Sequence, residues 1–131
     1  MIKKIKIMLA QLNPTVGDLE KNSKIILETY KDATQQQVDV LVFPEMFLSG
    51  YQLQDLVLKK AFQEDVKKFL NRLAKKCVTS TYLLLGAPIL EKEKLFNAYL
   101  LIYKGKTKVI SKKFHLPNNS LFDEHRYFNQ C

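Results

Sequence analysis

The sequence predicts an α/β fold that begins with a strand, a helix and a second strand in a parallel βαβ arrangement. Apolar residues alternate with lysine through most of residues 3–11, which indicates a strand. Residues 18–36 carry apolar side chains at helical spacing, and Asp18 is suited to cap that helix. Residues 39–43 are a short apolar run, typical of a strand buried on both faces. Because the connections are short, we expect the two strands to be parallel neighbours.

A second helix and three further strands are predicted in the remainder of the chain. From Val66 to Cys77, apolar residues recur on one helical face. Residues 82–90 are a third buried strand, and residues 96–103 and 107–113 form a hairpin around a Lys-Gly-Lys turn. Cys77 lies on the apolar face of the helix, so we interpret it as a small buried residue and not as a nucleophile.

Composition sets limits on the class of protein. At 131 residues, the chain has room for one domain and its core. No apolar run approaches the ~18 residues of a membrane span, and the alternating start is unlike a signal peptide. The two cysteines and two histidines have neither disulfide-framework nor metal-ligand spacing. We therefore expect a cytoplasmic protein with no membrane partner and no metal site.

The formal net charge of +8 raises the question of nucleic-acid binding. The lysines, however, are scattered over every predicted element and are not gathered with aromatic residues in one stripe. A compositional bias of the source genome towards lysine, isoleucine and asparagine would account for the charge as well. We therefore expect no nucleic-acid partner.

The stretch around Glu45 is the strongest candidate for a chemical site. Pro44 lacks the donor that a continuing strand would need, so strand 39–43 ends there. Glu45 follows directly among apolar residues, and Gly50 lets the chain turn away. A carboxylate inside an apolar collar at the C-terminal end of a core strand is placed to act as a general base. From the residues alone, the alternative is that Glu45 is a solvated loop residue or forms a structural ion pair with a lysine.

Four ordered segments resemble one family. FPEMFLSGY at 43–51 resembles the glutamate motif of the carbon–nitrogen hydrolase (nitrilase) superfamily. AQLNPTVGDLEKN at 10–22, SGYQLQDL at 49–56 and KKFHLPNNSLFDEHRYF at 112–128 resemble, more narrowly, the glutaminase domain of glutamine-dependent NAD synthetases. The resemblance covers nearly the whole chain, and it implies that residues 1–131 are part of such a domain. The fold it implies is the N-terminal half of a nitrilase-type α/β/β/α sandwich.

The resemblance also implies two further site residues. The lysine of the superfamily's lysine motif stands two residues before a histidine, which makes Lys113 the catalytic lysine and Lys112 its outward neighbour. Alternation supports this distinction, because adjacent strand residues face opposite sides. Tyr51 occupies a position that lies beside the substrate pocket in similar domains, so it is a substrate-binding candidate. Without the resemblance, both lysines would be interpreted as solvated.

The chemistry implied by the resemblance is amide hydrolysis through a covalent thioester. A cysteine thiolate attacks the carboxamide of glutamine, a glutamate takes the proton, and a lysine ammonium stabilises the oxyanion. Water then releases glutamate, and the ammonia serves a synthetase domain that forms NAD. Glutamine is the expected small-molecule substrate. We expect no cofactor in this chain, because ATP and Mg would belong to the synthetase domain.

The sequence supplies Glu45 and Lys113, but it has no cysteine where the family places its nucleophile, at a strand-to-helix elbow beyond the RYF motif. Cys131 has no strand before it and no helix after it to activate its thiol, so we do not expect it to serve. We therefore expect a truncated glutamine amidotransferase domain that is inactive alone. Its sheet should expose an apolar face and unpaired edges, and a complementary fragment or a homo-oligomer would cover them.

Two other functions stay open. The first is hydrolysis of another small amide by an amidase or nitrilase-like enzyme, which the SGYQLQDL and FDEHRYF segments disfavour. The other is a non-catalytic module that binds a partner subunit or nucleic acid. Convergence of Glu45 and Lys113 in one pocket would favour the catalytic ancestry, whereas a contiguous lysine face elsewhere would favour the module.

Overall fold

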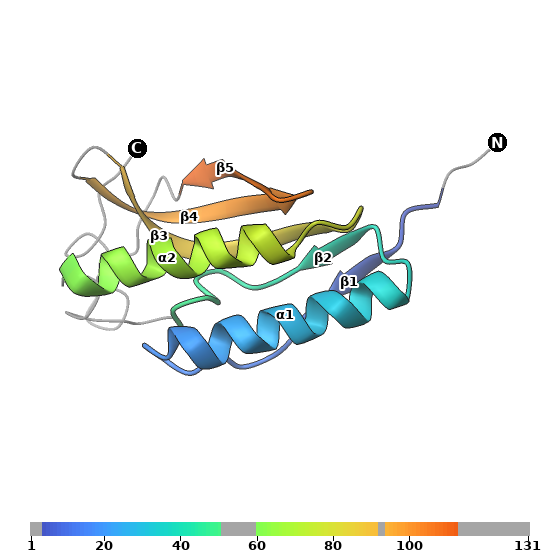
Figure 1. The fold of residues 1–131 in the computed structure, drawn as a ribbon, viewed down its shortest axis with the longest axis horizontal. Helices are drawn as coiled ribbons and strands as arrows, with labels where there is room; N and C mark the ends of the chain where they lie inside the picture. Colours follow the sequence, from blue (N-terminus) through green and yellow to red (C-terminus); the bar gives the residue numbers. More distant parts are fainter. Residues whose placement is uncertain (1–3, 51–59, 92–93, 113–131) are drawn as a thin grey trace.

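A computed structural model describes residues 4–50, 60–91 and 94–112, and the structural statements below refer to these residues. They form one five-stranded sheet and two helices (Figure 1). The elements in chain order are β1 (Ile7–Leu9), α1 (Leu19–Gln35), β2 (Val40–Val42), α2 (Lys60–Lys76), β3 (Tyr82–Glu91), β4 (Lys94–Tyr103) and β5 (Lys106–Lys112). The predicted α/β class is confirmed.

The strands lie in the sheet in the order of the chain. β1, β2 and β3 are parallel, with α1 and α2 as the connections, so the predicted βαβ unit is confirmed and a second one follows it. β3, β4 and β5 are antiparallel neighbours, as the predicted hairpin requires. β1 is shorter than the predicted residues 3–11. Its pairing is cut short where the Lys6 N–H donates to the Asp39 carboxylate, at 2.8 Å, in place of a backbone carbonyl.

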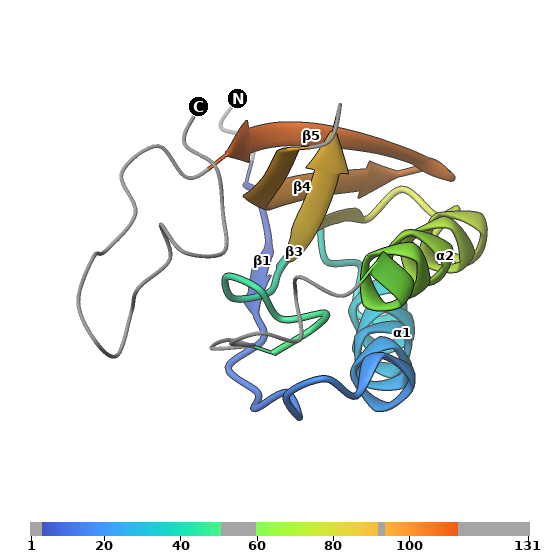
Figure 2. The same cartoon turned by 90° about the vertical axis from the view of Figure 1, so that its left-hand side faces the viewer.

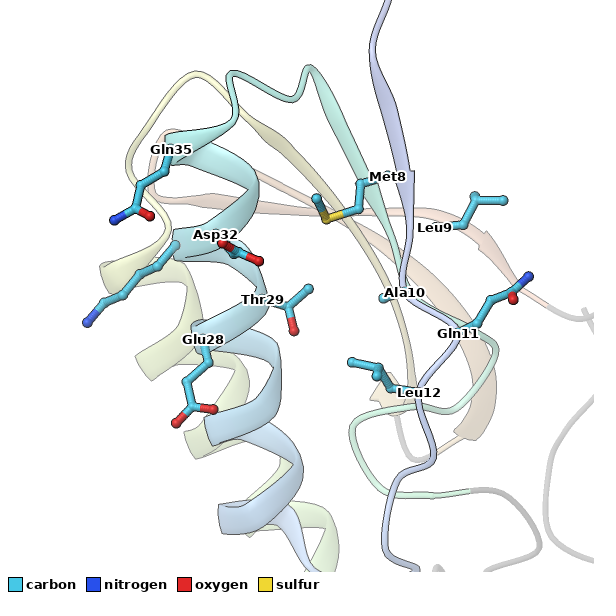
Figure 3. Close-up of a pocket in the computed structure, with 10 residues that line it drawn as sticks. Met8, Leu9, Ala10, Gln11, Leu12, Glu28, Thr29, Asp32 and Gln35 are labelled. Carbon is cyan, nitrogen blue, oxygen red and sulfur yellow. The ribbon is translucent and has the colours of Figure 1, made fainter.

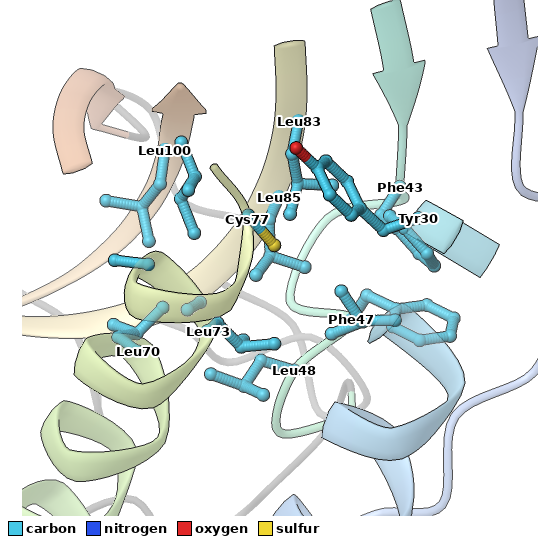
Figure 4. Close-up of a cluster of buried hydrophobic side chains, with 14 of the residues drawn as sticks. Tyr30, Phe43, Phe47, Leu48, Leu70, Leu73, Cys77, Leu83, Leu85 and Leu100 are labelled. Carbon is cyan, nitrogen blue, oxygen red and sulfur yellow. The ribbon is translucent and has the colours of Figure 1, made fainter. Parts of the chain in front are cut away.

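Both helices cover the same face of the sheet, as Figure 2 shows. Alternation along the strands sends one set of side chains into this layer, so that Leu83 and Leu85 of β3 lie beside Ile102 and Leu100 of β4. Figure 4 shows part of the resulting core. Its largest fully buried side chains are Phe43, Phe47, Ile26, Leu41, Met46, Leu48, Leu73, Leu83, Leu85, Leu100 and Ile102.

Helix α1 is anchored at both ends by polar contacts. The Asp18 carboxylate accepts a hydrogen bond from the Lys21 N–H at 3.0 Å, so the predicted N-cap is confirmed. Further along, the Tyr30 hydroxyl lies 2.5 Å from the Thr79 hydroxyl, and Thr34 lies 3.1 Å from it. These contacts join α1 to the connection between α2 and β3. Neither of the two described helices is long and apolar enough to cross a membrane.

The sheet face turned away from α1 and α2 is called the far face here. It carries large apolar side chains that are exposed, among them Ile7 and Leu9 of β1 and Leu90 of β3. Tyr82 and Tyr103 also lie on it, with their rings stacked at a centroid distance of 3.9 Å. Over the described strands, the expected apolar face is therefore confirmed. The marginal stability that we expect from it stays a prediction.

Cys77 follows α2 and is fully buried, which confirms its interpretation as a small core residue. Burial raises the pKa of its thiol from 9.0 to about 12. We expect native Cys77 in a Cys131→Ser background to resist thiol reagents at about pH 8 and to react once urea unfolds the chain. Rapid labelling of the folded protein would contradict this.

The same pKa shift predicts a pH dependence of stability. The folded state keeps the Cys77 proton at a pH where the unfolded state releases it. The contribution of the protonated thiol to the unfolding free energy is therefore complete below about pH 9 and is lost as the pH rises from 9 towards 12. Cys77→Ala should therefore flatten the fall in unfolding free energy above pH 9, measured by urea denaturation. Equal slopes for the parent chain and the variant would show that the thiol does not titrate in this way.

Candidate active site

Glu45 lies just beyond the C-terminal end of β2, where the sequence predicted it. Two hydrogen bonds, one with β4 and one with β3, hold this strand end. The Tyr99 hydroxyl donates to the Phe43 carbonyl at 2.7 Å, and the Phe43 N–H donates to the Leu84 carbonyl at 2.9 Å. β3 and β4 therefore fix the point from which the glutamate segment departs. Burial raises the pKa of Tyr99, which keeps its hydroxyl neutral as a donor.

The segment 44–50, called the glutamate loop here, packs directly on Gly86 of β3. A Cβ atom at Gly86 would lie 2.9 Å from the Cα of Glu45 and still closer to the backbone nitrogen of Met46. Only glycine permits this approach, because any larger residue would push the loop off the sheet. The Leu48 N–H also donates to the Gly86 carbonyl, at 3.3 Å.

Buried polar contacts hold the other side of the glutamate loop. The side-chain amide of Asn22, at the start of α1, donates to the carbonyls of Leu48 at 3.0 Å and Thr15 at 2.7 Å. The Gly17 N–H donates to the Ser49 carbonyl at 2.8 Å. The segment 10–22, which carries part of the family resemblance, thus binds the loop and fixes its position.

Met46 has a left-handed backbone conformation, with a φ of 58°. Such a conformation costs a residue with a side chain about 1–2 kcal/mol, and the side chain of Met46 is buried. A strained residue directly after Glu45 is typical of a segment whose shape is required for function.

The Glu45 carboxylate meets Asn97 of β4 on the far face. The side-chain amide of Asn97, which is 4% exposed, donates a hydrogen bond to Oε1 of Glu45. Both residues line a hollow of about 280 Å³, together with Ala98, Tyr99 and Ser111. A carboxylate and hydrogen-bonding groups around a small hollow suit the binding of a polar group of a small molecule.

The predicted apolar collar around Glu45 is wrong. Met46, Phe47 and Leu48 are each at most 1% exposed because they enter the core, where Phe47 packs against Phe43. Their side chains therefore leave Glu45 instead of surrounding it, and Glu45 is exposed. Within the described residues, its carboxylate accepts a hydrogen bond from the side-chain amide of Asn97.

Lys112 is engaged away from the hollow. Its ammonium lies 2.5 Å from the Glu91 carboxylate and over the ring of Phe96, and its strand partner is Ala98. A structural role for Lys112 agrees with the prediction that it is not the catalytic lysine. Lys113 and Tyr51 lie outside the described residues, so their predicted roles stay predictions.

Asn97, Gly86, Tyr99 and Ser111 are the parts of the site that sequence reasoning missed. A single asparagine inside an apolar strand was the one available signal, because a buried amide is costly unless it has a partner. Ser111 reaches the hollow through an irregularity in β5, where the register with β4 shifts between Tyr99 and Leu100. That shift has no local sequence signature.

A second hollow of about 510 Å³ lies between β1 and α1 (Figure 3). It is lined by residues 8–12 and by polar side chains of α1, and it contains none of the predicted site residues. In the described parts of the chain, no three His, Cys, Asp or Glu residues are grouped as a metal site would require. The hollow at Glu45 contains a predicted site residue, and it is therefore the candidate active site.

Residues 6–130 match the carbon–nitrogen hydrolase family. The chain belongs to this family. It is 38% identical over 130 residues to a glutamine-dependent NAD(+) synthetase of Rhodobacter capsulatus, covering 99% of this chain and 24% of that protein. It is also 38% identical to the enzyme of the same name from Thermotoga maritima, covering 97% of this chain and 22% of the relative. The chain thus spans about a quarter of the length of these relatives.

A solved structure extends the likeness to the fold. The chain superposes on a glutamine-dependent NAD(+) synthetase from Cytophaga hutchinsonii with a TM-score of 0.90 and 30% identity, covering 98% of this chain and 22% of that one. The family resemblance read from the motifs is confirmed. The described sheet with its one helix layer is the N-terminal half of a nitrilase-type α/β/β/α sandwich.

We predict that Gly86→Ala displaces the glutamate loop and lowers the unfolding free energy by about 1–3 kcal/mol, because the new methyl group meets backbone. Urea denaturation and the backbone amide NMR shifts of residues 44–50 measure the two effects. Gly105→Ala is the matched control. Gly105 has a positive φ, which Gly86 does not, and a Cβ there would have room, so its variant should lose stability through backbone strain without moving these shifts. Unchanged loop shifts in Gly86→Ala would contradict the prediction.

Proposed function

We propose that this chain carries the general base of a glutaminase that releases ammonia from glutamine for NAD synthesis. The observation that supports it most is the position of Glu45, held at the end of β2 and hydrogen-bonded to Asn97 in a hollow of the far face. Membership of the carbon–nitrogen hydrolase family supplies the reaction class. The glutamine-dependent NAD(+) synthetases among its relatives supply the substrate.

In this mechanism, Glu45 takes the proton of a cysteine thiol, and the thiolate attacks the amide carbon of glutamine. The tetrahedral oxyanion is stabilised by a lysine ammonium, for which we propose Lys113. Glu45 returns the proton to the leaving nitrogen, so that ammonia departs and a thioester remains. Glu45 then takes a proton from water, whose oxygen attacks the thioester carbon; the carbon–sulfur bond breaks, the sulfur takes the proton back from Glu45, and glutamate is released.

The choice of Lys113 is supported by the contacts of its neighbour. Lys112 pairs with Glu91 and stands over Phe96, so its ammonium is already engaged. We infer that Lys113, and not Lys112, is the catalytic lysine, and that Tyr51 contributes to the binding of glutamine.

The nucleophile of this mechanism comes from sequence beyond these 131 residues, in the same or a second polypeptide. Cys77 is excluded because it is buried in the core and its thiol pKa is raised to about 12. The same additional sequence, or a second copy of this chain, would cover the exposed apolar residues of the far face. The reaction takes place in the cytoplasm, and these residues hold no cofactor because ATP and Mg²⁺ serve the synthetase step.

A chimera tests the proposal. In the Thermotoga maritima relative, the aligned segment is replaced by this chain, and NAD formation is measured with glutamine and with free ammonia as nitrogen donors. We expect the chimera to use both. Glu45→Gln should reduce the glutamine-dependent rate by about 10²–10⁴-fold, because the amide cannot accept the proton, and leave the ammonia-dependent rate unchanged.

Lys113→Met and Lys112→Met form a matched pair in the same chimera. The first should abolish glutamine use, and the second should retain it, because Lys112 contacts Glu91. The chain alone should release no ammonia from glutamine. Undiminished glutamine use by the Glu45→Gln chimera would refute the proposed function.

A further inference from the structure

We propose that Asn97 is a positioning residue that fixes the orientation of the Glu45 carboxylate for proton transfer. The inference rests on the proposed function of Glu45 as the base. Its starting point is the hydrogen bond from the side-chain amide of Asn97 to Oε1 of Glu45, which joins residues 52 positions apart in the chain. An ionised carboxylate only accepts hydrogen bonds, so the amide of Asn97 is the donor.

The place of Asn97 in β4 is one where an apolar residue would be expected. Its neighbours Leu95, Phe96 and Ala98 are buried, and Asn97 itself is only 4% exposed. Burying an amide is unfavourable unless it forms hydrogen bonds, and an apolar residue would avoid that cost. The hydrogen bond to Glu45 gives this buried amide a partner at this point of the strand.

Both ends of this hydrogen bond are mounted on the same rigid part of the sheet. Asn97 lies opposite Pro88 in the pairing of β3 and β4, and Glu45 lies on Gly86, two residues earlier in β3. Neither backbone can shift without disturbing the sheet. The amide therefore meets the carboxylate at a fixed point, although Glu45 is itself exposed.

The expected consequence is catalytic. An exposed glutamate side chain samples several rotamers, and proton transfer needs the carboxylate within hydrogen-bond reach of the thiol in one orientation. Holding one carboxylate oxygen restricts both the rotamer and the plane of the carboxylate. Asn97 acts through Glu45, so its loss should slow the chemical step and leave the binding of glutamine nearly unchanged.

The test uses the chimera described above, with Asn97→Ala as the first variant. We expect kcat for glutamine-dependent NAD formation to fall about 10–100-fold, KM for glutamine to stay within about twofold, and the ammonia-dependent rate to be unchanged. Tyr30→Phe is the matched control, because it removes a hydrogen bond to Thr79 on the helix side of the sheet. It should lower the melting temperature without lowering kcat.

Asn97→Asp separates positioning from a merely structural role. This variant keeps the shape of the side chain but replaces the donor by a carboxylate beside Glu45. As the pH falls from about 8 to about 6, the two carboxylates increasingly share a proton and a donor is restored, so its kcat relative to the parent should rise. Tyr99, the other titratable residue lining the hollow within the described chain, stays neutral in this range because burial raises its pKa.

The outcomes are distinguishable. If Glu45→Gln abolishes glutamine use while Asn97→Ala keeps the parent kcat, the role of Asn97 is refuted and the proposed function stands. If Glu45→Gln keeps glutamine use, the proposed function itself fails. If Asn97→Ala and Asn97→Asp lose activity only in proportion to folded protein, measured by circular dichroism, and no pH-dependent recovery occurs, Asn97 is a structural residue and the inference is wrong.

Discussion

The close contact between the glutamate loop and Gly86 is the constraint on which the site depends. Because no Cβ fits at Gly86, the backbone of Glu45 and Met46 lies directly against β3. Hydrogen bonds from Leu48 to Gly86 and from Asn22 to Leu48 then fix the loop from two sides. A segment that would ordinarily be a mobile surface connection is thereby built as part of the core, and its one carboxylate keeps a defined position.

Strand alternation separates stability from chemistry in this chain. On β4, Leu100 and Ile102 point into the helix layer and contribute to the core, whereas Asn97 and Tyr99 serve the far face. One strand therefore holds the sheet together and presents the groups that position Glu45. A substitution on either face should affect mainly one of the two properties.

The fold could be predicted from the sequence because buried faces repeat with fixed periods in strands and helices. Glu45 could be placed because Pro44 marks the end of a core strand. The contact with Asn97 could not, since it joins distant residues and periodicity does not reveal which polar groups meet. The exposure of Glu45 was predicted wrongly because the directions of its apolar neighbours depend on the conformation of Met46 and its packing.

Hydrogen exchange of the isolated chain tests most directly whether the glutamate loop is part of the core. We predict that the amides of Phe43 and Leu48, which donate to β3, exchange as slowly as the amides within β3 itself. Slow exchange would mean that the site of Glu45 is formed within these residues. Fast exchange at Phe43 and Leu48, with β3 still protected, would mean that the loop opens independently of the sheet and is not part of the core.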